Sequence, residues 1–281
     1  MKTAIITDST AYISEEMRKQ FDIHMVPLSV IFGEETYREE IDISAEQYFQ
    51  KIKEAKNLPT TSQPPIGEFV ELFEQLKKNG YDAAVVVTLS SGISGTYQGV
   101  ISAGDMVSDF EVYAYDSEIS CMVQGFYVLE GAQMAKEGKK PEEIIARFDE
   151  MKPSIRAYFM ADDLSHLQRG GRLNAAQAII GSLLQVKPLL HFVDKKIVPY
   201  EKIRTRKRAI KRIIELLDED AQEQVPMKGV VIHANRAAEA EELQRELAQK
   251  YPHIEWSISY FGGVIGTHLG EGAIGVGWYK K

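Results

Sequence analysis

Unbroken apolar runs in the first half of the chain constrain its fold more than any other feature of the sequence. They span residues 3–7, 83–89 and 112–115, and each is followed by a hydroxyl-rich turn and then by a stretch with helical periodicity. Apolar runs without alternation are typical of strands covered on both faces, and helices between them are typical of parallel βαβ units. We therefore predict an α/β fold with a parallel sheet in the N-terminal part.

The turns after these predicted strands carry the first candidate functional groups. They are residues 8–10 (DST), residues 90–96 (SSGISGT) and residues 116–117 (DS). Ligands of open α/β sheets bind beyond the carboxyl ends of the strands. The sequence thus predicts a binding site at this edge of the sheet.

The second half of the chain has a different sequence pattern. Pro141 and Pro153 bracket a predicted helix that precedes it. We predict an N-terminal α/β domain over residues 1–153 and a C-terminal α/β domain over residues 154–281, with a cleft between them. The C-terminal domain is predicted to contain a basic helix over residues 205–217 and strands over residues 186–190, 196–199, 229–233, 254–260 and 272–279.

Composition excludes several classes of protein. Cys121 is the only cysteine among 281 residues, which excludes a disulfide framework and a Cys-rich zinc site and favours the reducing cytoplasm. A net charge of -8 argues against general nucleic-acid binding. Asp8 interrupts the N-terminal apolar run, so no signal-peptide core is expected, and no stretch approaches the roughly 20 apolar residues of a membrane span. The six histidines show no metal-ligand spacing, so we predict no metal site.

Gly270, Gly272 and Gly275 formally match the dinucleotide-binding fingerprint. That motif requires a following helix and an acidic residue about 20 positions later. The sequence continues only to Lys281, so we expect neither. We instead interpret residues 272–279 as a strand whose glycines permit close backbone approach.

The turn at residues 92–96 lies between a predicted strand and a predicted helix, and three interpretations are open. Its hydroxyls can simply cap the helix. The hydroxyls and the helix N-terminus can receive a carboxylate or phosphate. Alternatively, Ser94 can act as a hydrolase nucleophile with His268 or His233 as its base, although Thr96 stands where a nucleophile elbow has glycine.

Two further segments are candidates for a binding site, each with a structural alternative. Residues 59–65 (PTTSQPP) offer three hydroxyls on an extended loop that prolines stiffen, a pattern that plain loops also show. His268 lies between Gly266 and Gly270, where the glycines can let a ligand approach the backbone, but a lone histidine is usually structural.

Basic residues gather in the second half of the chain. Arg169 and Arg172 flank a Gly-Gly turn, and a basic segment follows that contains Arg204, Arg206, Lys207, Arg208, Lys211 and Arg212. The apolar stripe of the predicted helix turns these charges outward. They form either a solvated face or a site for a phosphate or an acidic partner.

Taken together, these motifs resemble the DegV family over essentially the whole chain. The family order is matched by residues 7–11 (TDSTA), 60–64 (TTSQP), 90–98 (SSGISGTYQ), 115–117 (YDS), 169–172 (RGGR), 187–188 (KP), the arginine-rich helix and 267–272 (THLGEG). The resemblance implies a two-domain DegV-like fold that binds a long-chain fatty acid without catalytic residues or cofactors. Some members are the binding subunit of a bacterial fatty acid kinase, in which a separate ATP-using subunit makes an acyl phosphate for phospholipid synthesis.

The resemblance also assigns roles to residues. Thr61 and Ser94 would donate hydrogen bonds to the fatty acid carboxylate, and His268 would lie beside it, with Ser62, Gly95 and Thr96 in support. Arg172 and Arg204 would serve the kinase subunit or the phosphorylated product. The alternatives are a serine hydrolase of lipid or acyl esters that uses Ser94, and a nucleic-acid-binding protein that uses the basic helix. Neither stable membrane insertion nor nucleic-acid binding is expected of the carrier.

Overall fold

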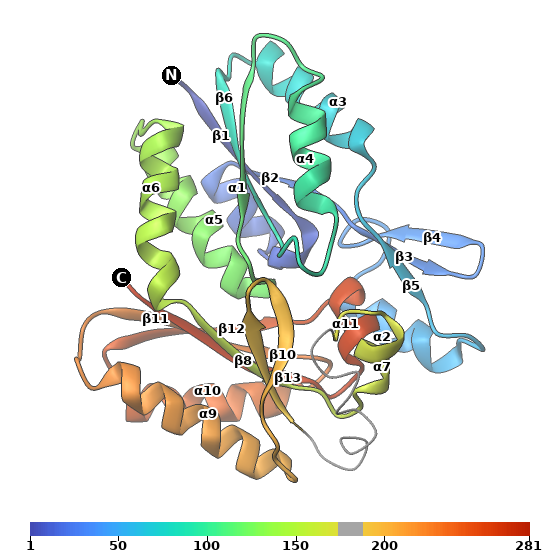
Figure 1. The fold of residues 1–281 in the computed structure, drawn as a ribbon, viewed down its shortest axis with the longest axis vertical. Coiled ribbons are helices and arrows are strands. Elements are labelled where there is room, and N and C mark those ends of the chain that lie inside the picture. The colour runs from blue at the N-terminus through green and yellow to red at the C-terminus, as the bar shows by residue number, and fades with distance from the viewer. Residues whose placement is uncertain (174–187) are drawn as a thin grey trace.

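The computed structural model describes residues 1–173 and 188–281, and within them it contains three sheets (Figure 1). A four-stranded sheet and a six-stranded sheet lie in the two halves of the molecule, and a small three-stranded sheet lies to one side. This arrangement confirms the predicted α/β class with a parallel sheet in the N-terminal part.

The four-stranded sheet has the order β2-β1-β6-β7, and every neighbouring pair is parallel. Its strands are β1 (Thr3–Asp8), β2 (Ile23–Val26), β6 (Ala83–Thr88) and β7 (Glu111–Asp116). All side chains of β1 and β6 are buried, as the unbroken apolar runs predict. The helices are η1 (Ser9–Ala11), α1 (Glu15–Phe21), α3 (Ile66–Lys78), α4 (Thr96–Gly104), α5 (Cys121–Lys136) and α6 (Pro141–Met151).

Helices cover this sheet on both faces. Ala4 and Ile6 of β1 pack in a core cluster with the aromatic side chains of α3, including Phe73. Ile5, which points to the opposite face, packs in the cluster that contains Val128 of α5. The alternation follows from the period of two along a strand, and it explains why the sheet is apolar on both sides.

The three-stranded sheet has the order β4-β3-β5 and is antiparallel. Its strands are β3 (Ser29–Phe32), β4 (Glu35–Arg38) and β5 (Thr60–Ser62), and α2 (Ala45–Glu54) connects β4 to β5. The hydroxyls at residues 60–62 therefore do not lie on the loop predicted from the prolines. They form a strand because their backbone pairs with β3, with Thr61 opposite Val30.

The six-stranded sheet has the order β10-β9-β8-β13-β11-β12, and only β11 and β12 pair in parallel. Its strands are β8 (Arg156–Met160), β9 (Leu189–Val193), β10 (Lys196–Glu201), β11 (Met227–His233), β12 (Ile254–Tyr260) and β13 (Ile274–Lys280). The associated helices are η2 (Lys152–Ser154), α7 (Ser165–Arg169), α9 (Arg206–Ala221), α10 (Ala237–Lys250) and α11 (Gly263–Leu269). Residues 186 and 187, which belong to a predicted strand and to a family motif, lie outside the described residues.

The last strand lies in the middle of this sheet, as its glycines permit. Gly277 stands opposite Ala157 in the register, and a Cβ there would overlap the Val123 side chain of α5. The fingerprint glycine Gly275 likewise packs closely against Phe159. Both contacts fit the interpretation of this segment as a strand with close backbone approach. The predicted boundary between residues 153 and 154 falls within η2, just before β8, and the division into two domains stays a prediction.

None of the described helices is long and apolar enough to cross a membrane.

The core beneath α3 offers a test of the packing. Phe73 is fully buried, whereas Met106 is two-thirds exposed. We expect Phe73→Ala to lower the free energy of unfolding by about 3–5 kcal/mol because it leaves a cavity, and Met106→Ala to change it by at most about 0.5 kcal/mol. Urea unfolding followed by circular dichroism measures both. Equal effects of the two substitutions would contradict the packing described.

Candidate functional site

A deep pocket of about 860 Å³, counted out to its mouth, lies between the two halves of the molecule. Its walls come from the loops after β2 and β6, from β5 and α5, and from β8, β9, β10, β11, β13 and α11. Most of the lining is apolar: Leu28, Leu89, Ile93, Cys121, Val123, Ala157, Tyr158, Phe159, Leu167, Phe192, Ile197, Ile232, Phe261, Val264, Ile265, Leu269 and Val276. An apolar cavity with few polar groups suits an organic ligand with a long hydrocarbon part.

The structure brings the predicted residues Thr61, Ser94 and His268 together in the wall of this pocket. They come from β5, from the turn before α4 and from α11. The Thr61 Oγ1 atom lies 2.9 Å from the His268 Nε2 atom, within hydrogen-bond distance. Ser62 and Gly95 also line the pocket.

Strand geometry selects Thr61 among the three neighbouring hydroxyls. Thr60 and Ser62 are exposed on one face of β5, and Thr61 is half-buried on the other face, toward α11. The Ser62 hydroxyl donates a hydrogen bond to the main-chain oxygen of Gln63. Alternation along the strand thus points only one of the three hydroxyls at His268.

Ser94 sits at the beginning of α4, where its hydroxyl serves the helix terminus. Its Oγ atom lies 2.9 Å from the Oγ1 atom of Thr96 and accepts a hydrogen bond from the Thr96 main-chain N–H. No histidine among the described residues forms a hydrogen bond with Ser94. His268 contacts Thr61 instead, and the His233 Nδ1 atom accepts from the main-chain N–H of Arg236.

His268 is held as a neutral imidazole. Burial, together with the nearby charges of Arg172 and His166, lowers its pKa to about 4. Its buried Nδ1 atom has no hydrogen-bond partner in the described part of the chain. Gly170 lies directly behind this atom, and a Cβ at that position would overlap the ring. The Gly-Gly turn therefore leaves room for the imidazole, a role that its sequence did not reveal.

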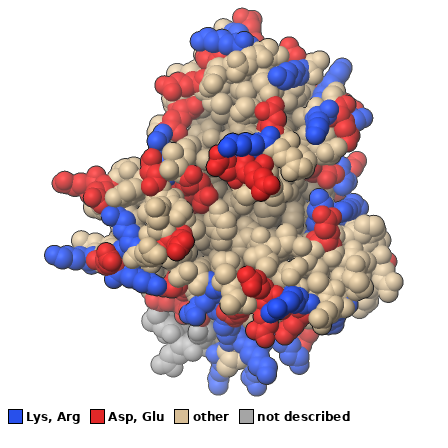
Figure 2. Space-filling view, turned by 180° about the vertical axis from the view of Figure 1, so that it is seen from behind, with Lys and Arg blue, Asp and Glu red and all other residues tan. Residues whose placement is uncertain are grey.

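The two arginines predicted to serve a partner or phosphate lie in different places. Arg172 lines the pocket, where its Nε atom donates to the main-chain oxygen of Ile93 at 3.1 Å. Arg204 is exposed, just before α9 begins. Figure 2 shows Lys and Arg side chains gathered along the lower edge of the molecule. Only Arg172 is placed to contact a molecule inside the pocket.

Several charges of the basic helix are already paired. The guanidinium of Arg206 forms an ion pair with Glu239 at 2.6 Å, and that of Arg212 forms one with Glu201 at 2.9 Å. Arg204, Lys207 and Arg208 are exposed and have no ion pair with any described residue. The available positive charge is therefore concentrated around the N-terminal end of α9.

The hairpin of β9 and β10 closes one side of the pocket. Its tip residue Lys195 accepts a hydrogen bond from the Ser90 hydroxyl at 2.6 Å through its main-chain oxygen. The Lys195 ammonium also lies 3.0 Å from the buried carboxylate of Asp116. Gly92 packs so closely on Lys195 that a Cβ would overlap the backbone. Tertiary contact with a distant hairpin thus explains the glycine in this turn.

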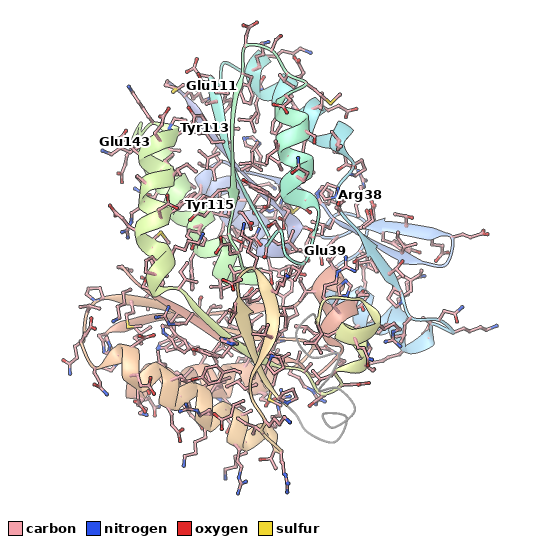
Figure 3. All side chains as sticks on the ribbon, viewed as in Figure 1. Arg38, Glu39, Glu111, Tyr113, Tyr115 and Glu143 are labelled. Atoms are coloured by element: carbon pink, nitrogen blue, oxygen red, sulfur yellow. The ribbon has the colours of Figure 1, made fainter. Side chains whose placement is uncertain are left out.

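Glu39, which the sequence did not single out, fixes the helix that carries His268. Its carboxylate accepts hydrogen bonds from the Ser9 hydroxyl at 2.6 Å, the Tyr12 hydroxyl at 3.0 Å and the Val264 main-chain N–H at 2.8 Å. Burial raises the pKa of Glu39 to about 7. Figure 3 shows Glu39 near the centre of the molecule, beside α11.

A comparison with known families agrees with this architecture. A family model described as "Uncharacterised protein, DegV family" matches residues 2–281. The chain belongs to the DegV family. A curated member, Protein DegV of Bacillus subtilis, is 60% identical over 282 residues, which cover 100% of both chains.

Solved structures of the DegV family have the same fold. The crystal structure of DegV from Bacillus subtilis, described as a fatty acid binding protein, is 60% identical, covers 100% of both chains and has a TM-score of 0.96. A fatty acid binding DegV family protein from Streptococcus agalactiae is 35% identical, with a TM-score of 0.91 over 100% of this chain and 99% of that one.

The environment of His268 predicts its titration. We expect nuclear magnetic resonance to find its imidazole neutral at pH 6, where an unperturbed histidine with a pKa of about 6.5 is mostly protonated. Between about pH 4 and 6.5 the unfolded chain binds more protons at this residue, so its contribution to stability falls as the pH is lowered. The variant His268→Gln should therefore lose less stability on acidification than the wild type. A normal pKa for His268 in the folded protein would contradict this assignment.

Proposed function

We propose that this protein binds a long-chain fatty acid, with the carboxylate at Thr61, Ser94 and His268 and the hydrocarbon tail in the apolar pocket. The observation that carries the proposal is one deep apolar pocket with a small group of polar side chains in its wall. The description of similar DegV structures as fatty acid binding proteins supports it.

Burial of the tail supplies most of the affinity in this proposal. Each buried methylene contributes about 0.8 kcal/mol, so a long chain provides on the order of 10 kcal/mol before the costs of association. A carboxylate inside a protein needs hydrogen-bond donors to offset its loss of water. The hydroxyls of Thr61 and Ser94 provide such donors, so the head group mainly sets the orientation of the ligand.

The neutrality of the donors affects how readily the bound carboxylate can be phosphorylated. His268 is uncharged at neutral pH, and Thr61 and Ser94 are neutral hydroxyls. Neutral donors leave more electron density on the carboxylate oxygens than a bidentate arginine pair does, because no full positive charge neutralises them. This favours a carboxylate that attacks the γ-phosphate of ATP held by another protein. Arg172, in the same pocket, is placed to receive the negative charge that phosphorylation adds.

We further propose that the protein is the non-catalytic binding subunit of a fatty acid kinase and acts in the cytoplasm, ahead of phospholipid synthesis. Arg204, Lys207 and Arg208 offer positive charge without an intramolecular ion pair to the described residues, in a chain with a net charge of -8. Such a local excess suits an acidic surface on a partner. The kinase subunit would dock there and supply ATP.

Ligand content tests the binding proposal directly. We expect native mass spectrometry of the purified protein, or of the protein mixed with palmitate or oleate, to show one bound fatty acid. Thr61→Val should weaken binding about fivefold to twentyfold because it removes a donor to a charged group. Thr60→Val, on the exposed face of β5, serves as the matched control. A protein that stays empty, or that becomes labelled at Ser94 by a fluorophosphonate as a serine hydrolase would, contradicts the proposal.

Docking of the kinase subunit makes a separate prediction. Arg204→Ala should leave fatty acid retention unchanged and slow acyl phosphate formation by the kinase subunit, because the residue lies outside the pocket. Arg245→Ala, which removes an exposed charge from α10, is the control. Loss of fatty acid retention in Arg204→Ala would place this residue in the carboxylate site and reject its assigned role.

A further inference from the structure

The apolar pocket that carries Thr61, Ser94 and His268 is called the acyl pocket below. A second pocket adjoins it and shares part of its wall. It has about 790 Å³ of empty space out to its mouth, and Ala157, Tyr158 and Phe192 line both pockets. We name it the rear pocket; it extends from these shared residues to Lys152, His191 and Tyr127. The three shared residues belong to β8 and β9.

The shared wall lies away from the proposed carboxylate site. Ala157 is near the beginning of β8, and the end of β8 leads to α7, which packs against α11 and His268. Three residues of strand separate Ala157 from Met160 at the end of β8, which corresponds to roughly 10 Å. A chain that begins at His268 and follows β8 therefore approaches the rear pocket with its far end.

The rear pocket is lined by charged and polar side chains beside the residues that it shares with the acyl pocket. Its lining includes the apolar side chains of Ile119 and Ile155 and the polar ones of Glu118, Lys152, Arg156 and His191. The Lys152 ammonium lies 2.7 Å from the Glu118 carboxylate, so this cation is paired within the pocket.

His191 and Arg156 can bind a polar group there. His191 forms no hydrogen bond with a described residue, and burial lowers the pKa of its imidazole, so it is a neutral group that can donate and accept. The Arg156 guanidinium lies 3.6 Å from Asp220 and donates to main-chain oxygens through Nη1. The His191 imidazole and the Arg156 guanidinium thus suit a hydroxyl or a carboxylate.

We propose that the rear pocket receives the far end of the bound acid, and that this end carries an oxygen, as a terminal hydroxyl or a second carboxylate. The inference rests on the proposed function, since the acyl pocket must hold the rest of the chain. Ala157 and Phe192 line both pockets, so the chain would pass beside them. A fatty acid that is oxygenated at its far end is therefore a ligand class of this protein, in addition to plain fatty acids.

The proposal and a closed apolar tunnel predict different affinities for an acid with a terminal hydroxyl. A hydroxyl forced into an apolar cavity without a partner would weaken binding by at least about tenfold. If the far end reaches the rear pocket, that penalty disappears. We therefore expect stearate and its terminally hydroxylated derivative to bind within about threefold of each other, and to compete for the same protein.

Isothermal titration with stearate, the terminally hydroxylated derivative and the corresponding dicarboxylate provides the test. Ala157→Leu should narrow the passage between the two pockets and weaken both oxygenated probes at least about fivefold more than a shorter plain acid such as laurate. Phe192→Ala should widen it and favour the oxygenated probes. Lys152→Met should weaken the dicarboxylate about threefold and leave stearate unchanged, with Lys136→Met on exposed α5 surface as the control.

The outcomes distinguish failure of this inference from failure of the proposed fatty acid binding. Failure of stearate to bind would reject the fatty acid proposal, and this inference with it. Stearate binding with an oxygenated probe at least tenfold weaker, or with a probe that binds without competing, would overturn the inference alone. Thermal melting of each variant confirms that it is folded, and Phe192→Ala, which only removes atoms, keeps the test available if Ala157→Leu does not fold.

Discussion

The buried carboxylate of Glu39 joins three segments on which the rest of the site depends. It accepts hydrogen bonds from the turn after β1, through Ser9 and Tyr12, and from the first turn of α11, through Val264. A buried acceptor with these partners satisfied stabilises the structure, whereas the same carboxylate without them would destabilise it. Because α11 carries His268, this one residue of the N-terminal half determines where a side chain of the C-terminal half meets the pocket.

The pocket must hold polar groups inside an apolar wall. Its apolar wall lowers the dielectric around any head group, which makes a charge expensive, and its polar residues must then be neutral or well paired. Burial holds His268 uncharged and Thr61 beside it, and Arg172 is engaged with the main-chain oxygen of Ile93. The site is thus preorganised by contacts within the protein, and the His268 Nδ1 atom is left without a hydrogen-bond partner among the described residues.

The sequence predicted the parallel strands well, because a strand covered on both faces leaves a continuous apolar run that local reading detects. The small antiparallel sheet was missed, since β3, β4 and β5 are short and only partly buried, and the pairing of β5 depends on residues about 30 positions away. The family resemblance predicted Thr61, Ser94 and His268, which line one pocket, and their role in carboxylate binding stays a prediction. No local signal identified Glu39 or the reason for Gly170. Their roles follow from contacts with distant segments, which periodicity does not encode.

The position of β13 has a consequence for biosynthesis. This strand follows every other strand along the chain, yet it lies between β8 and β11 and hydrogen-bonds to both. A nascent chain that has not yet released β13 from the ribosome presents two unpaired strand edges and lacks the Val276 part of the pocket wall. Closure of the pocket wall therefore waits for the insertion of β13, and before that step the unpaired edges of β8 and β11 are exposed to aggregation.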